Sequence, residues 1–318
     1  MWLKREEILW KQRSRISWLS EGDDNTRFFH ACANARRRSS DIKLLQRSNG
    51  EYTSNPEEVK AIIVNYYRDL FTSRQTLSKE DIQPYLHIIP SKVTSRHNEI
   101  LLAPYTPVEV TRALFQIDPN KAPGYDGFSA AFFQHNWEVI QSDFTRECLH
   151  FLNLSHFNAA NNTTLITLIP KQKGASKVTD FRPISLTGVM AEVVSKAITN
   201  RLQQILEEVI CPEQCAFLKH RLISDNVLIV NEVSHFINKS RSHRRVYASL
   251  KLDMAKAYDK IEWDFLELIM KKLGFDEEWV DRVLTYVRSA SYCIRVNRDI
   301  SDFFYPSRGL RQGDPLSP

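Results

Sequence analysis

Strand-like segments are few in this sequence, and long helical stretches separate them. Short apolar runs, many of them β-branched, predict strands at Leu165–Ile169, Val246–Leu252, Tyr292–Val296 and Phe303–Tyr305. Apolar periodicity predicts helices at 187–209, 224–240, 258–273 and 276–289. Because these helices do not alternate one for one with strands, the pattern excludes a regular βαβ fold and predicts an α+β chain.

The N-terminal half is predicted to be mostly helical. Helices are expected at 1–19, 24–38, 55–71, 106–116 and 129–155, with a hairpin turn at Asn49-Gly50. Asn55-Pro56-Glu57-Glu58 supplies a helix cap, a first-turn proline and acids that face the helix dipole. Ser and Pro punctuate residues 72–104, which predicts a linker-like segment. We expect a basic extension over 1–160 and a second region over 161–318.

The excess of basic residues is concentrated in two blocks. Residues 1–50 hold 11 basic and 6 acidic residues, and residues 171–260 hold 15 and 9, whereas the whole chain carries a net charge of only +5. Such blocks are compatible with two solvated basic faces, and they also fit an anionic partner such as a nucleic acid.

Cysteine usage and hydropathy indicate an intracellular chain. Five scattered cysteines fit a reducing compartment rather than a disulfide framework. No run of 18 apolar residues occurs, and the charged N-terminus lacks a signal-peptide core. We therefore expect no membrane span, and the choice between nucleus and cytoplasm stays open. Cys211, Cys215 and His220 lack a fourth ligand for a structural zinc site.

One carboxylate stands at a position suited to metal chemistry. The predicted strand Val246–Leu252 leads directly into Asp253, and a carboxylate at a strand end is a natural ligand for Mg²⁺. Alone, such an aspartate is more often a turn former or a helix cap.

Five sequence boxes follow one another in the second region. They are LIPK at 168–171, FRPISL at 181–186, RLISDNVL at 221–228, LDMAKAYDKIEW at 252–263 and GLRQGDPLSP at 309–318. In this order they resemble the reverse transcriptase of non-LTR, LINE-type retrotransposons. Upstream, GDDNTRFFHACANARRR at 22–38 and DPNKAPGYDGFSAAFFQHNW at 118–137 are similar to the segments that precede that polymerase.

The resemblance implies a right-hand polymerase fold, with fingers and a partial palm behind the helical N-terminal extension and with the thumb absent. It implies an RNA-directed DNA polymerase that uses Mg²⁺, deoxynucleoside triphosphates, an RNA template and a DNA primer. Asp253 matches the first of three metal-binding aspartates, and the carbonyl of Met254 would add a ligand. The metals would activate the primer hydroxyl and stabilise the leaving pyrophosphate.

The resemblance also implies a nucleotide pocket. Lys171 and Arg182 match the finger residues that hold the triphosphate, a task that suits charge-assisted hydrogen bonds. Tyr258 matches the steric gate that excludes a 2′-hydroxyl, and Arg311 and Gln312 match the loop that lines the pocket.

Template or primer contacts are implied for Arg221, Asn226, Gly309 and Gly313. The two glycines would let the backbone approach the substrate closely.

Three positions depart from the family pattern. His220 stands where a glycine is usual and would remove freedom for a positive φ. Glu192 follows Ala191 where an aromatic-Lys pair is usual, so a basic contact becomes acidic. Tyr125 replaces a proline.

The second metal-binding box of the family, Tyr/Phe-Ala-Asp-Asp, does not occur in this sequence. One aspartate cannot hold two Mg²⁺ ions, so we expect little or no polymerase activity from this chain alone. The alternative from another functional class is a non-catalytic nucleic-acid-binding remnant. Oligomeric state, template choice and target-site choice stay open.

Overall fold

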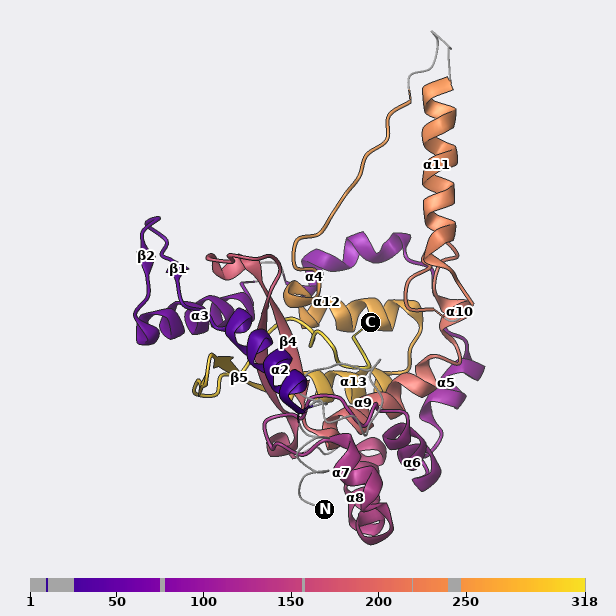
Figure 1. Cartoon of the computed structure of the whole chain (residues 1–318). Coiled ribbons are helices and arrows are strands. Elements are labelled where there is room, and N and C mark those ends of the chain that lie inside the picture. The colour runs from indigo at the N-terminus through magenta and orange to yellow at the C-terminus, as the bar shows by residue number, and fades with distance from the viewer. Residues whose placement is uncertain are drawn as a thin grey trace.

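The computed structural model describes residue 10 and residues 26–74, 78–155, 158–218, 220–239 and 247–317. A mixed β-sheet lies in the middle of the molecule with helices packed around it (Figure 1). The α+β class predicted from the strand spacing is therefore confirmed. The helix predicted at 1–19 lies outside the described residues apart from Trp10, which is helical.

The central sheet has the strand order β4-β3-β5-β6. These strands are β3 (Thr163–Pro170), β4 (Phe181–Thr187), β5 (Ser291–Val296) and β6 (Asp299–Ile300). β3 pairs antiparallel with β4 and parallel with β5, so segments more than 120 residues apart lie side by side. β3 and β5 confirm two predicted strands.

β4 was missed because it contains Pro183, which pairs with Leu168 of β3. A proline lacks the N–H group of the ladder and is tolerated mainly in edge strands. β4 is such an edge.

Two strand predictions were wrong. Phe303–Tyr305 contributes only an isolated bridge between Phe304 and Tyr292. Residues 247–252 form no strand, and Leu250 and Leu252 are more than 80% exposed. A strand is stable only beside a partner that satisfies its N–H and C=O groups, and no described strand lies next to this segment.

The N-terminal predictions from local signals are confirmed. α2 spans Thr26–Ser40, and the hairpin pairs β1 (Leu45–Gln46) with β2 (Tyr52–Thr53). α3 (Pro56–Leu70) begins after Asn55, whose side chain accepts hydrogen bonds from the backbone N–H groups of Glu57 and Glu58. α6 (Pro107–Phe115) begins with the capping box at Thr106 and Glu109.

The linker predicted at 72–104 was wrong for its described part. It contains α4 (Lys79–Ile82), the 3₁₀ helix η1 (Gln83–Ile88) and α5 (Ser95–Leu102). Ser78 and Thr94 act as N-caps there, so Ser78, one of the serines that suggested a loop, instead begins a helix. The fully buried Leu101 ties α5 to the core.

The remaining elements follow the predicted helices with breaks. They are α7 (Ala130–His135), α8 (Trp137–Leu154), η2 (Ala159–Asn162), η3 (Val178–Asp180), α9 (Val189–Leu202), α10 (Leu206–Val209), α11 (Ile223–Lys239), η4 (Tyr258–Lys260), α12 (Trp263–Leu273) and α13 (Glu277–Arg288).

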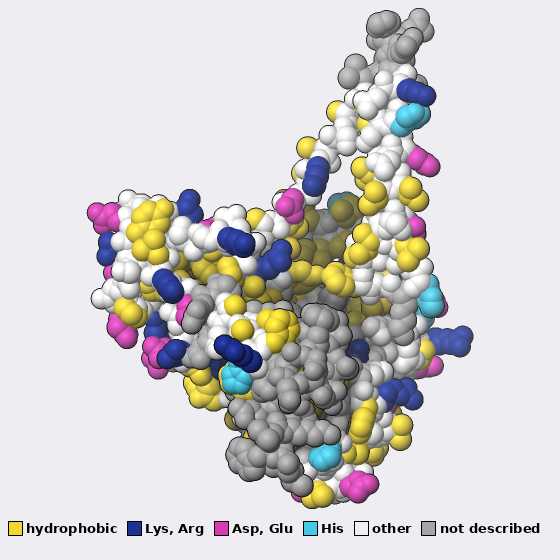
Figure 2. All heavy atoms as spheres, viewed as in Figure 1, with side chains coloured by type: hydrophobic (Ala, Val, Ile, Leu, Met, Phe, Trp, Pro, Cys, Tyr) yellow, Lys and Arg dark blue, Asp and Glu magenta, His cyan; other side chains and the backbone are white. Residues whose placement is uncertain are grey.

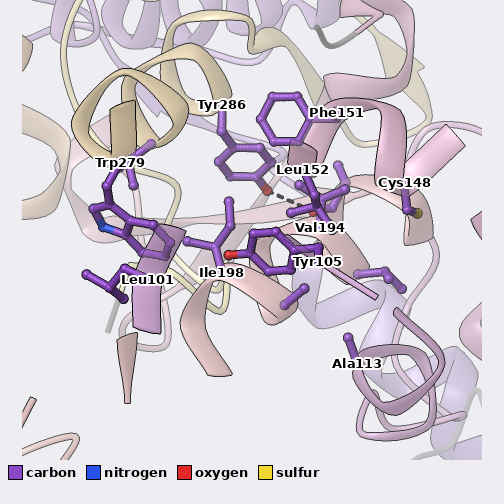
Figure 3. Close-up of a cluster of buried hydrophobic side chains, with 14 of the residues drawn as sticks. Leu101, Tyr105, Ala113, Cys148, Phe151, Leu152, Val194, Ile198, Trp279 and Tyr286 are labelled. Atoms are coloured by element: carbon purple, nitrogen blue, oxygen red, sulfur yellow. Dashed lines mark hydrogen bonds between the residues drawn. The ribbon is translucent and has the colours of Figure 1, made fainter. Parts of the chain in front are cut away.

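Two hydrophobic clusters stabilise the body. One lies among the helices around α9 and includes Leu101, Val194, Trp279 and Tyr286 (Figure 3). The other lies between α3 and the sheet. Both clusters draw residues from either side of residue 160, so the domain boundary placed there stays a prediction.

α11 projects from the body, and an extended segment from residue 247 returns to the body, diverging from α11 on the way (Figure 1). No described residue of α11 is buried. Hydrophobic side chains, including Val227, Val230 and Phe236, lie exposed along it (Figure 2). No helix in the described ranges is long and apolar enough to cross a lipid bilayer.

Candidate active site

Three of the sequence boxes meet at one backbone joint. The Gly309 N–H donates to the Ile261 carbonyl at 2.7 Å, and the Leu310 N–H donates to the Tyr258 carbonyl at 2.8 Å. The Trp263 indole N–H donates to the Gly309 carbonyl at 2.8 Å. These bonds hold the loop at 308–314 against the turn at 258–263.

The same loop is also bonded to β4. The Ser185 N–H donates to the Gln312 carbonyl at 3.1 Å. The LDMAKAYDKIEW, GLRQGDPLSP and FRPISL boxes are therefore neighbours in space, although they are up to about 130 residues apart in the sequence.

Gly309 is required by the geometry of this joint. Its φ is +87°, and a Cβ atom would lie 2.7 Å from the Asp259 carbonyl oxygen and 3.0 Å from Phe71 Cδ1. The close backbone approach expected at Gly309 thus occurs within the protein, against the turn that follows Asp253. Gly313 also has a positive φ, +103°, and is exposed.

Asp253 and Met254 lie in the extended segment that precedes this turn, and both are exposed. The described residues contain no group of three His, Cys, Asp or Glu side chains that could hold a metal ion. A single exposed carboxylate does not form a Mg²⁺ site, which needs several oxygen ligands in octahedral geometry. The residues described here therefore do not by themselves fit the metal that the resemblance implies.

Asp259 is the buried carboxylate of the turn, with 6% of its surface exposed. Burial raises its pKa, and the charges of Lys256, Lys171 and Lys260 oppose that rise. Lys171 of the LIPK box therefore lies within electrostatic range of the turn. Lys256 has a positive φ of 58°. Its ammonium group donates a hydrogen bond to the Tyr66 hydroxyl. It also makes a cation–π contact, with Nζ 4.4 Å from the centroid of the Tyr66 ring.

The predicted finger residues lie on the β3–β4 hairpin and are exposed. Lys171 follows β3, and its ammonium group donates to the Thr179 carbonyl at 2.8 Å. Arg182 lies on β4 opposite Ile169. A crevice of about 560 Å³ opens between residues 41–44 and 170–176, and Lys43, Lys171 and Lys173 contribute to its lining.

Gln312 and Arg311, the residues expected to line the nucleotide pocket, differ in exposure. Gln312 is half-buried, whereas Arg311 is only 4% exposed and its guanidinium group is bonded to other parts of the protein. Tyr258, the predicted steric gate, is half-buried at the start of η4.

Arg221 and Asn226 are far from this joint in the sequence and make contacts of their own. The Arg221 guanidinium group donates to the carbonyls of Glu207, Ile210, Cys211 and Gln214 at 2.6–3.3 Å. The Cys215 thiol donates to Asn226 Oδ1 at 3.1 Å. Both side chains stabilise the turn between α10 and α11.

His220 does not abolish the left-handed conformation of that turn. The histidine itself adopts a φ of +63°, a conformation usually reserved for glycine. The loss of positive-φ freedom expected from its side chain is therefore not observed, although a histidine at such a φ carries a steric cost of about 1 kcal/mol.

The other two departures from the family pattern have partners in this chain. Glu192 is buried and forms an ion pair with Lys121. Burial raises the Glu192 pKa, and Lys121 opposes this rise. Tyr125 makes an edge-to-face contact with Phe303, with ring centroids 5.3 Å apart.

Sequence reasoning missed Asp314 and its partners Ser195 and Tyr286. Asp314 is 3% exposed and accepts a hydrogen bond from the Tyr286 hydroxyl at 2.6 Å. The only signal available was the position of Asp314 inside the GLRQGDPLSP box. Tyr286 and Ser195 carry no signal, because each lies in an ordinary helix.

Residues 169–318 match the family model described as reverse transcriptase (RNA-dependent DNA polymerase). The C-terminal part of the chain is therefore similar to reverse transcriptases. The chain is 30% identical to the "Transposon TX1 uncharacterized 149 kDa protein" of Xenopus laevis, over 96% of this chain and 23% of that protein.

Two further relatives come from Drosophila melanogaster. The Pol polyprotein of the R2DM element is 28% identical over 64% of this chain and 18% of the relative. The probable RNA-directed DNA polymerase from transposon BS is 23% identical over 85% of this chain and 29% of the relative. The chain is related to the Pol proteins of non-LTR retrotransposons, and it spans less than a third of the length of these three relatives.

Proposed function

We propose that this chain forms the fingers and the first part of the palm of a right-hand, RNA-directed DNA polymerase. The reaction would add deoxynucleotides to a primer 3′-hydroxyl on an RNA template. The observation that carries this proposal is the backbone joint at Gly309. It places the turn after Asp253, the Gln312 loop and β4 beside one another.

In this proposal the β3–β4 hairpin holds the triphosphate. Lys171 and Arg182 are exposed there, and Lys171 lies within electrostatic range of Asp259. A guanidinium group and an ammonium group complement phosphate oxygens through charge-assisted hydrogen bonds. Tyr258 would meet the sugar from the turn, and Gln312 would meet the base from its loop.

The template and primer would contact Gly313 and the turn that Arg221 and Asn226 stabilise. Gly309 would act indirectly, because its backbone is already bonded within the protein. Asp253 and the Met254 carbonyl would contribute to a Mg²⁺ site only together with further carboxylates. With the described residues alone, no metal-dependent step is assigned to this chain.

The first test is binding of a fluorescent RNA–DNA primer-template at increasing salt. We expect affinity to fall steeply, with a log–log slope that reports the number of neutralised phosphates. Because Lys171 and Arg182 are assigned to the triphosphate, the double variant Lys171→Gln/Arg182→Gln should leave that slope nearly unchanged and should instead weaken nucleotide binding. Glu99→Gln, an exposed change on α5, serves as a surface control. Salt-independent binding would contradict the proposal.

The second test is primer extension with Mg²⁺ and deoxynucleotides. We expect no product from this chain. Extension that is lost in Asp253→Ala would overturn the inactivity but support the polymerase assignment.

A non-catalytic nucleic-acid-binding role is the second candidate, and the lone exposed Asp253 favours it. The two roles differ in their response to nucleotide. On a primer that ends in a dideoxynucleotide, a polymerase pocket is stabilised by the next complementary deoxynucleotide, whereas a simple phosphate-binding surface is not. The dissociation rate of that primer-template, with and without the nucleotide, separates them.

A further inference from the structure

The loop at 309–317 alternates between inward and outward residues. Arg311 and Asp314 are 4% and 3% exposed, whereas Gly313 between them is exposed and Gln312 is half-buried. Two charged side chains thus point into the protein and leave the intervening dipeptide at the surface.

Asp314 is bonded to two helices. Its Oδ2 atom accepts a hydrogen bond from the Tyr286 hydroxyl of α13 at 2.6 Å. Its Oδ1 atom accepts one from the Ser195 hydroxyl of α9, and one from the Leu316 N–H at 3.0 Å. The Ser195 oxygen also lies 3.1 Å from the Leu316 nitrogen. Hydrogen bonds to a buried carboxylate are stronger than neutral ones, so this cluster fixes the end of the loop.

Arg311 fixes the beginning of the loop. Its guanidinium group donates to Asn162 Oδ1 at 2.6 Å and to the Tyr286 carbonyl at 3.4 Å. It also stacks on the Tyr286 ring, with Cζ 4.5 Å from the ring centroid. Figure 3 shows this ring beside Phe151 in the helical core. Asn162 is itself held, because its amide group donates to the Tyr286 carbonyl and to Ser289 Oγ, both at 2.8 Å.

The electrostatics favour the charged form of Arg311. Burial disfavours the charged form of Arg311, yet Tyr286 and Asp314 together hold its pKa above the ordinary value. The Arg311 Nε and Asp314 Oδ2 atoms lie 3.6 Å apart. A buried charge without its partner is strongly destabilising, so each member of the pair requires the other.

We propose that Arg311, Asp314, Tyr286 and Ser195 are positioning residues that hold Gln312 at the nucleotide site and Gly313 beside the template or primer. This inference rests on the proposed polymerase function. It gives Arg311 an inward role in place of the nucleotide contact implied by the family resemblance. The residues from α9 and α13 act only through the loop and do not touch substrate.

The variant Tyr286→Phe tests the proposal with little change in shape. It removes the hydroxyl that bonds to Asp314 and keeps the ring under Arg311. The matched control is Tyr105→Phe, since the Tyr105 hydroxyl is buried in the same helical core and Arg282, not Asp314, is the charged side chain that interacts with it. Asp314→Asn and Asp314→Ala form a graded pair, because asparagine keeps the shape and part of the hydrogen bonding.

Two readouts separate positioning from folding. Hydrogen–deuterium exchange of the amides at 310–317 reports the anchor directly. Slowing of dideoxy-primer-template release by the next complementary deoxynucleotide reports the pocket. We expect Tyr286→Phe to speed loop exchange and to weaken the apparent nucleotide affinity about fivefold or more, a change of about 1 kcal/mol. Primer-template affinity should change less, by about twofold at most, because Gly313 is one contact among many phosphate contacts.

Asp314→Ala should have a larger effect than Asp314→Asn on both readouts, and Tyr105→Phe should change neither. Unchanged loop exchange in Tyr286→Phe would overturn the anchor. Faster exchange with unchanged nucleotide affinity would overturn the positioning role and leave the proposed function standing. An absent nucleotide effect in the unaltered chain would instead overturn the proposed function, and the positioning role with it.

Discussion

Replacing Gly309 with alanine should destabilise the protein more than the same change at any glycine in open space. Two separate costs act at Gly309. A positive φ of +87° costs an L-residue about 1–2 kcal/mol. A Cβ 2.7 Å from the Asp259 carbonyl oxygen forces backbone to move, at a cost of about 1–3 kcal/mol.

Part of this cost is offset in the unfolded chain. Alanine has less conformational freedom than glycine there, which returns about 0.4–1 kcal/mol. We therefore expect Gly309→Ala to lower the free energy of unfolding by about 1–4.5 kcal/mol.

Two other glycines separate the two costs. Gly50 has a φ of +90° with no heavy atom within 4 Å of its Cβ position, so Gly50→Ala measures the dihedral cost alone. Gly124 lacks a positive φ, but its Cβ would lie 2.5 Å from the Gly188 nitrogen, so Gly124→Ala measures the steric cost alone. The effect at Gly309 should approach the sum of the other two.

The measurement is urea unfolding followed by far-UV circular dichroism on the three variants and the unaltered chain. Equal destabilisation by Gly309→Ala and Gly50→Ala, within about 0.5 kcal/mol, would refute the close approach of the loop to the Asp259 turn. A similar midpoint with a lower denaturant slope would instead indicate loss of cooperative unfolding.

Three further changes test other parts of the structure. Lys121→Met should destabilise the fold by about 1–3 kcal/mol, because it leaves the buried Glu192 carboxyl group without its partner; adding Glu192→Gln should restore most of the melting temperature, and a neutral single variant would contradict the pair. Burial raises the pKa of Asp259, so the stability that this carboxyl group contributes is fully present below its ordinary pKa of 3.8 and is lost as pH rises through the folded value. Asp259→Asn should therefore gain melting temperature relative to the unaltered chain as pH rises from about 4 to about 8, and parallel pH curves would exclude this. Asn55→Ala should cost about 1 kcal/mol and Asn55→Asp almost nothing, in the same melting assay.

Local signals predicted the helices at 55–71 and 106–116, because the interactions that begin a helix lie within a few residues of one another. The Asn55 cap and the Thr106 capping box were both predicted and both form. Residues 247–252 show the opposite case. Their composition favours a strand, but a strand depends on a partner elsewhere in the chain, which composition does not supply.

The site residues also divide into those that local sequence predicted and those whose role depends on distant partners. The ordered boxes indicated the family and singled out Asp253, Lys171, Arg182 and Gln312, which the comparisons with relatives do not test individually. The boxes did not reveal that Arg221 is committed to the turn between α10 and α11, because its four carbonyl partners follow no side-chain pattern.

By itself, the sequence determined the α+β class, most helix boundaries and the reverse transcriptase relationship, since periodicity, caps and ordered motifs are written along the chain. Only the tertiary structure decided that Gly309 packs on the Asp259 turn and that Arg311 faces inward. The Arg311–Asn162 hydrogen bond joins residues 149 positions apart, and contacts of that range depend on how the helices and the sheet pack around both partners.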